Sequence, residues 1–250
     1  MSALLSLCSV HGSAAVWHAD ELARQSGEVL STGHAVLDAE LPGGGWPVGA
    51  LVEVLQACSA LAGQNEWRLL LPALKCTKPG LVVLVGAPHV PFGPALMAQG
   101  VDAQRLLWVS SAAPAQQLWA AEQALRCAQV VAVLAWLPLA RAEQLRRLHM
   151  AAHEHRKLLF VMRPGQARAQ ASPAVLRLLL TRAPPGTALD ALALHIFKRR
   201  GPPLVQTLLL PARSAALAAL LALSEQGEQG KCTGRDAGGG DALDRLAAAA

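Results

Sequence analysis

Short runs of apolar residues recur along the chain, and segments with apolar residues at helical spacing separate them. The runs that we expect to form strands before the last part of the chain cover residues 50–55, 80–86, 106–109, 130–136 and 158–162. A continuous apolar run, rather than an alternating one, is typical of a parallel strand with both faces buried. The pattern therefore predicts a set of buried parallel strands.

The segments between these runs have the spacing of amphipathic helices. Residues 115–127 place Leu118, Ala121 and Leu125 on one face of a helix. Further helices are predicted at residues 67–74, 91–99 and 141–156, and Pro72 interrupts the first of them. Alternating strands and helices predict an α/β fold with a mostly parallel sheet and helices on both faces.

The pattern changes near the C-terminus. Residues 176–181, 191–199 and 204–210 are predicted strands joined by short links, and Gly201-Pro202-Pro203 forms the turn between the last two. Short links favour antiparallel strands added at one edge of the sheet.

One domain with two tails is the predicted organisation. Residues 1–25 form a partly disordered N-terminal segment with a short helix at its end, and residues 26–223 form the domain. Residues 211–223 are a candidate terminal helix of this domain. Residues 224–250 are rich in glycine, cannot bury a core and are predicted to be disordered.

The composition supports a globular body. Of 250 residues, 53% are hydrophobic and 16% are charged. The formal net charge is +5, and because residues 224–250 contain five acidic and three basic residues, the rest of the chain carries +7. This balance permits contact with nucleic acid or an acidic partner but establishes neither.

Cysteine usage and the length of the apolar runs favour a cytoplasmic protein. The five cysteines are scattered without a Cys-x-x-Cys pair, which suits reduced thiols better than disulfides or a zinc site. Residues 1–19 contain no Lys or Arg, so the basic start of a signal peptide is missing. We expect no membrane contact, since no unbroken apolar run is long enough to span a bilayer.

Residues 29–64 have the order of elements that leads into a phosphate-binding loop. A Ser31-Thr32-Gly33 turn precedes a short helix that ends in Leu37-Asp38, and a glycine-rich loop then leads to the first strand. The next segment, residues 56–64, has one glycine but neither the Lys nor the Ser/Thr that would hold phosphates and magnesium.

The acidic groups of a RecA-like ATPase are also missing. Gly86-Ala87-Pro88-His89 stands where a catalytic Glu would follow the second strand, and residues 130–136 end without a magnesium-binding Asp. Glu66 adds negative charge where phosphates need positive charge. Because three elements are absent together, we predict no ATP hydrolysis, no catalytic residue and no cofactor.

Two other groupings could carry chemistry. His149 and His153 are four residues apart on a predicted helix, a spacing used by metal ligands, and His155 is close to them. No carboxylate completes such a site and cations surround it, so we predict an exposed helix face and no metal. Ser110-Ser111 follows a strand, but no partner base can be named for it.

Lys198, Arg199 and Arg200 are the candidate contact residues for DNA or a protein partner. Three adjacent cations beside Phe197 could bind nucleic-acid phosphates or an acidic surface. The alternative is a solvated hairpin that protects a sheet edge. Further cations that could extend this face are Arg141, Arg146 and Arg147.

The motifs together resemble one family. They are Ser31-Thr32-Gly33, Leu37-Asp38, Leu41-Pro42-Gly43-Gly44-Gly45, Gly49-Ala50-Leu51-Val52-Glu53 and Lys198-Arg199-Arg200-Gly201. With the vacated phosphate loop and the single-domain length, they resemble the ImuA family of RecA- and SulA-like proteins associated with translesion DNA synthesis. The resemblance covers about residues 15–212.

The resemblance implies a RecA-like three-layer core and a non-catalytic accessory protein of SOS-induced translesion synthesis. The implied partners in this mutasome are ImuB, an inactive Y-family polymerase homologue, and an error-prone DnaE-type polymerase. RecA and a weak contact with DNA are further candidates. We expect the sheet edge and the N-terminal region to serve as docking surfaces, because RecA-type domains assemble by strand addition.

Two alternatives remain open. The first is a SulA-like SOS cell-division inhibitor that binds the tubulin-like division protein. The second is a functional ATPase with a cryptic loop, which would require tight ATP binding that is lost on changing Gly63 or Gln64.

Overall fold

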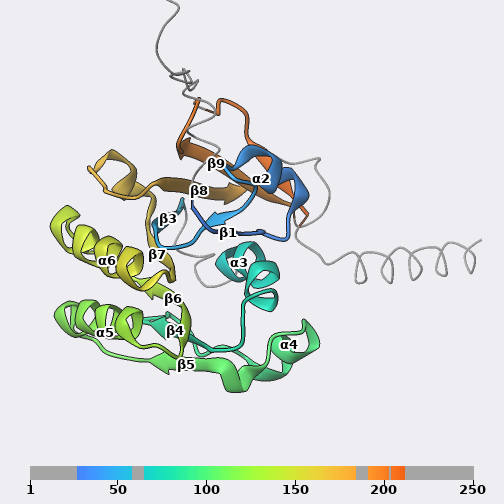
Figure 1. The fold of residues 1–250 in the computed structure, drawn as a ribbon. Helices are drawn as coiled ribbons and strands as arrows, with labels where there is room; N and C mark the ends of the chain where they lie inside the picture. The colour runs from blue at the N-terminus through green and yellow to red at the C-terminus, as the bar shows by residue number, and fades with distance from the viewer. Residues whose placement is uncertain (1–26, 58–64, 184–190, 203, 212–250) are drawn as a thin grey trace, which may run out of the picture.

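The computed structural model describes residues 27–57, 65–183, 191–202 and 204–211 (Figure 1). Its main sheet has eight strands in the order β10-β9-β8-β3-β7-β6-β4-β5. In chain order these strands are β3 (Leu51–Gln56), β4 (Leu81–Val85), β5 (Leu106–Val109), β6 (Val130–Trp136), β7 (Leu158–Pro164), β8 (Leu176–Arg182), β9 (Leu192–Lys198) and β10 (Leu208–Leu210). The strands from β8 to β5 are parallel, and β9 and β10 pair antiparallel at one edge, which confirms the predicted fold class.

Helices cover both faces of the sheet and make three layers (Figure 1). The helices are α2 (Ala35–Glu40), α3 (Asn65–Lys75), α4 (Gly93–Ala98), α5 (Pro114–Arg126) and α6 (Ala142–His155), with 3₁₀ turns η2 (Ala103–Arg105) and η3 (Gly165–Ala169). Residues of α2 and α3 share one large hydrophobic cluster, residues of α5 and α6 share a second, and Leu71, Leu96 and Val101 form a small third one. The sheet separates the first two clusters.

The central strand β3 explains why the apolar runs are continuous. Successive side chains of a strand point to opposite faces. Val52 and Val54 belong to the cluster under α2 and α3, whereas Leu51 belongs to the cluster under α5 and α6. Glu53 shares the face of Leu51 and is fully buried. Both faces of β3 therefore exclude water.

Most predicted elements are confirmed close to their predicted bounds, but α3 and β10 differ. α3 runs from Asn65 to Lys75 and continues through Pro72, although proline removes a helical hydrogen bond. Leu70 and Leu74 on the same helix are fully buried, so packing compensates for the lost bond.

The last strand is shorter than predicted. Only Leu208–Leu210 pair with β9, whereas the sequence favoured a strand over residues 204–210. Val205 is 92% exposed, so it does not pack against the sheet as Leu208 and Leu210 do. The predictions for residues 1–25, 58–64, 211–223 and 224–250 lie almost wholly outside the described residues.

The predicted turn and short helix before β3 form a small unit of their own. β1 (Val29–Leu30) pairs antiparallel with β2 (Trp46–Pro47) on either side of α2. Asp38 of α2 accepts hydrogen bonds from Ser31 Oγ at 2.7 Å and from Thr32 N at 2.8 Å. One carboxylate therefore fixes the turn that precedes its own helix.

Gly33 is the residue through which this turn packs against Pro72 of α3. We expect its replacement to destabilise the fold. Its φ is +78°, and a β carbon there would lie 2.4 Å from Pro72 Cβ. Gly44 has the same φ of +78° but open space around it. Gly44→Ala should lower the free energy of unfolding by roughly 1–2 kcal/mol through backbone strain alone, and Gly33→Ala by clearly more. Urea unfolding of the two variants measures the difference, and equal losses would contradict this packing.

Candidate functional site

The carboxyl ends of the parallel strands form the edge where ligands bind in open α/β sheets. A cleft of about 620 Å³ lies at this edge. It is lined by Gln56, Ala57, Gly86, Pro88, Ala112, Pro114, Gln117, Trp136, Pro138, Leu139, Met162, Arg163, Pro164 and Gln166. Arg163 is the one charged residue among these lining residues.

A carboxylate occupies the start of α3 at the same edge. Glu66 is fully buried in the first turn of this helix. Its Oε1 accepts a hydrogen bond from Trp136 Nε1 at 3.1 Å, and Trp136 ends β6. The start of a helix has a positive field that favours a negative group. In a phosphate-binding loop that group is a phosphate, whereas the first turn of α3 has the carboxyl group of Glu66.

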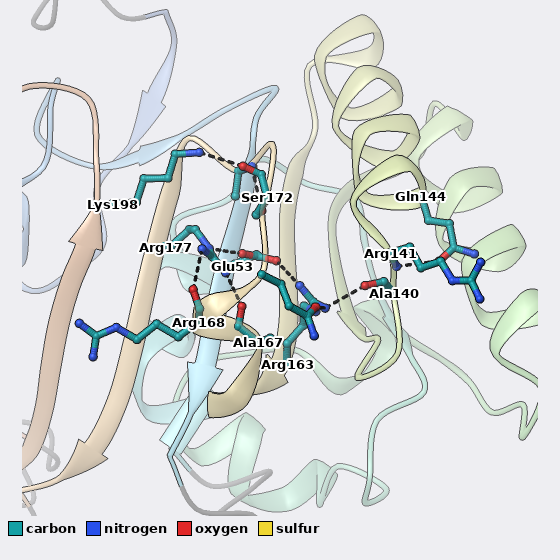
Figure 2. Close-up of polar contacts among 12 residues, drawn as sticks. Glu53, Ala140, Arg141, Gln144, Arg163, Ala167, Arg168, Ser172, Arg177 and Lys198 are labelled. Carbon is teal, nitrogen blue, oxygen red and sulfur yellow. Dashed lines mark hydrogen bonds and ion pairs between the residues drawn. The ribbon is translucent and has the colours of Figure 1, made fainter.

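Arg163 is not available to a ligand in the cleft as a free charge, because it belongs to a buried ion cluster around Glu53 (Figure 2). Arg163 Nη1 lies 2.9 Å from Glu53 Oε1, and Arg177 Nε donates to Glu53 Oε2. All three side chains are at most 7% exposed. They come from β7, β3 and β8, three neighbouring strands of the sheet.

The two arginines also bind the connection between β7 and β8 and the loop between β6 and α6. Arg163 Nη2 donates to the carbonyl of Ala140 at 2.8 Å and to Gln170 Oε1 at 2.6 Å. Arg177 Nη2 donates to the carbonyl of Ala167 at 2.8 Å. The bonds to Gln170 and Ala167 hold η3 over the face of β3. The cluster therefore stabilises the connection where it crosses the sheet.

The predicted basic cluster lies at the opposite end of the strands from the cleft. β9 is antiparallel to β8, and Lys198 at the end of β9 pairs with Arg177 near the start of β8. Lys198, Arg199 and Arg200 therefore stand at the amino ends of the parallel strands, away from the cleft.

The three cations do not form a uniform row. Lys198 Nζ donates to the carbonyl of Ser172 at 2.9 Å. Arg199 is half-buried and forms an ion pair with Glu40 of α2, Nη1 to Oε2 at 3.1 Å. Arg200 is exposed and makes no hydrogen bond to another described residue. Arg199 therefore serves mainly to fasten the turn after β9 to α2.

The three arginines of the α6 region that could have extended this cluster lie at separate positions and do not join it. α6 begins at the carboxyl edge and runs back for 14 residues, or about 21 Å, so Arg141 at its start is remote from Lys198. Arg147 points to α5 and pairs with Glu122 at 2.5 Å. Arg146 is exposed in the middle of α6.

His149 is the residue of α6 that comes close to the basic cluster. Its Nδ1 accepts a hydrogen bond from the backbone N–H of Leu51 at 3.0 Å. Burial lowers the pKa of His149, and the nearby charges of His153, Arg200 and Lys198 lower it further. In the described residues no three His, Cys, Asp or Glu side chains are grouped to hold a metal ion.

Sequence reasoning missed the residues that surround the basic cluster. Arg168 of η3 lies over the ring of Phe197 at 5.3 Å from the centroid, and Arg177 lies over the same ring at 4.9 Å. Glu53 was the available signal, because a charge within an apolar strand needs buried partners. Its partners could not be named, since they lie 110 and 124 residues further along the chain.

Comparison with known proteins gives one partial similarity to report. No family model matches the chain. Cell division inhibitor SulA of Edwardsiella piscicida is 32% identical over 88 residues, which cover 35% of this chain and 52% of SulA. The chain thus spans about half the length of the curated relative that it matches. Among the described residues, no helix combines the length and apolarity needed to cross a membrane.

We expect Glu53→Ala to destabilise the protein strongly, because two buried guanidinium groups would lose their counter-charge. Breaking a buried ion pair in this way costs about 3–5 kcal/mol. Glu122 offers a matched control, since it also bridges two arginines, Arg126 and Arg147, but these are 52% and 71% exposed. Glu122→Ala should cost under about 1 kcal/mol. Chemical unfolding of both variants tests the contrast, and similar losses would show that the cluster is not critical.

The lowered pKa of His149 predicts acid sensitivity. The unfolded chain binds a proton at a higher pH than the folded protein does, so stability should fall as the pH drops below about 6.5. The lowered pKa of His34, caused mainly by burial, acts in the same direction. His149→Asn should make the melting temperature less dependent on pH between about 7 and 5.5. His89→Asn, at an exposed histidine, is the control, and an equal effect of both variants would refute the assignment.

Proposed function

We propose that this chain is a non-enzymatic protein of the DNA-damage response that acts by binding another protein. The observation that carries this proposal is the cleft at the carboxyl ends of the parallel strands, in a sheet whose strand order is RecA-like. The one charged residue among the lining residues, Arg163, is already paired with Glu53. Nucleotide hydrolysis needs a cation on the phosphates and acids on the magnesium. The described lining offers neither in an available form.

One role in that response is inhibition of cell division. The partial similarity to cell division inhibitor SulA supports it most directly. In this role the chain would bind the tubulin-like division protein and block division while DNA damage persists.

A second role is that of an accessory protein of translesion synthesis. It is supported by the motifs of the ImuA resemblance, two of which are linked through α2. Asp38 of α2 holds the Ser31–Thr32 turn, and Glu40 of the same helix pairs with Arg199 of the basic hairpin. In this role the chain would join ImuB and a DnaE-type polymerase in a mutasome.

In either role, the edge strand β5 is the surface that we propose for docking. β5 pairs with β4 on one side, and no described strand pairs with its other side. Leu107 is 49% exposed and Trp108 is 40% exposed, and no charged residue occurs in the strand. An uncharged open edge is a template for an added strand.

Copurification from cells treated with nuclease tests the proposal. The chain should capture either the division protein, with cell filamentation on expression, or ImuB and the polymerase, and it should not hydrolyse ATP. Capture of none of these proteins would contradict the binding role, and steady ATP turnover would contradict the non-enzymatic one.

Two matched leucines test the docking edge. Leu107→Lys places a charge on β5 and should weaken capture of the partner by about tenfold, or roughly 1.4 kcal/mol, because a charged edge resists strand addition. Leu209→Lys makes the same change on β10 at the other edge, where the leucine is 43% exposed, and should leave capture unchanged. Equal behaviour of the two variants would exclude β5 as the docking edge.

A further inference from the structure

The antiparallel end of the sheet has one face on which α5 and α6 do not pack, and on which Ala193 is buried but its neighbours are partly exposed. The opposite face of β8, β9 and β10 is buried in the cluster under α2. On the partly exposed face, Leu179, His195 and Phe197 are only half-buried. Thr207 and Leu209 on the same face are exposed. α5 and α6 cover the sheet only further along, over β4, β6, β7 and β3.

A guanidinium group at the margin of this face makes no side-chain hydrogen bond within the described residues. Arg168 is exposed, and its guanidinium carbon lies 5.3 Å from the centre of the Phe197 ring. A cation over an aromatic face is held by attraction to the ring. The side chain of Arg168 makes no hydrogen bond to another described residue, so its N–H groups remain available to an anion.

The surroundings of Arg168 have more positive than negative charge. Beneath it, Arg163 and Arg177 share the single carboxylate of Glu53, which leaves one positive charge in excess. Lys198 lies next to Arg177 in the register. Arg199 is neutralised by Glu40, but Arg200 beyond it is exposed.

Two titrating groups lie near these charges, and burial is the first cause of the pKa shift in each. The pKa of Lys198 is lowered by burial and then by the charge of Arg177, with Glu53 opposing. The pKa of His149 is lowered by burial and then by the charges of His153, Arg200 and Lys198. An anion bound at this face would oppose only the part of each shift that comes from the positive charges.

We infer that the partly exposed face of β8–β10 binds single-stranded nucleic acid. Arg168, Lys198 and Arg200 contact the phosphates, and unpaired bases lie against the ring of His195 and against the stack that Arg168 forms on Phe197. Cations that follow the backbone beside aromatic rings on a sheet are the usual means of binding single strands without sequence preference. A purely acidic protein segment would need the cations but would gain nothing from the rings. The inference is separate from the protein-binding role and stands or falls without it.

Fluorescence anisotropy of the full chain with a labelled single-stranded DNA of roughly 20 nucleotides tests the inference, since such a strand exceeds the usual site size. Arg168→Gln should weaken binding by about threefold to tenfold and reduce the slope of log affinity against log salt by about 1. Arg68→Gln removes the same charge from an exposed position on α3, which packs on the other face of the sheet, and should change neither. Equal losses in the two variants would overturn the site.

Phe197→Leu separates base stacking from charge. It keeps an apolar side chain over Arg177 and should weaken binding of single-stranded DNA and RNA by roughly fivefold or more, with the salt slope unchanged. Thermal unfolding checks that each variant is folded. If Phe197→Leu does not fold, the result for the surface variant Arg168→Gln decides whether the site is correct. Equal affinity for duplex DNA would overturn the stacking of unpaired bases. Binding of polyglutamate in place of DNA, with the same dependence on Arg168, would assign the face to an acidic protein instead.

Discussion

The sheet depends on one buried carboxylate that two guanidinium groups share. Glu53 lies on the central strand β3, and Arg163 and Arg177 reach it from the strands on either side. A buried ion pair adds little stability compared with well-packed apolar residues, but removing one partner is costly. The cluster therefore acts mainly as a constraint on arrangement. It requires β7 and β8 to flank β3. Arg177 also fixes η3 above them through the carbonyl of Ala167, and Arg163 binds the loop before α6 through the carbonyl of Ala140.

The same cluster explains the distribution of functional surfaces. At the carboxyl ends of the strands, Arg163 is paired with Glu53, and Glu66 in the first turn of α3 accepts a hydrogen bond from Trp136. Toward the amino edge the cluster has the opposite effect, because its unbalanced positive charge lies beneath Arg168 and Lys198. One set of residues therefore occupies Arg163 at one end of the strands and leaves net positive charge at the other.

The sequence predicted the strands well where burial alone decides them. Val130–Trp136 was predicted with its observed bounds, because a strand buried on both faces has an uninterrupted apolar run. β10 was predicted too long, since Val205 is apolar but exposed, and composition does not distinguish the two cases.

The candidate site was predictable only in part. The row Lys198 to Arg200 is visible in the sequence, but its members have different partners, and these come from α2 and from the loop before β8. No local pattern in the sequence singled out Arg168. The ring that it contacts, Phe197, lies 29 residues later in the chain and is brought near it by the register of β8 and β9.

The order of the strands sets a length scale for the whole molecule. β9 and β5 are separated by six strand spacings, or about 29 Å at the usual distance between neighbours. A nucleic acid on the first and a protein segment added to the second would not touch each other. The sheet would then work as a rigid spacer, able to keep a bound strand of nucleic acid at a fixed distance from the protein recruited to it.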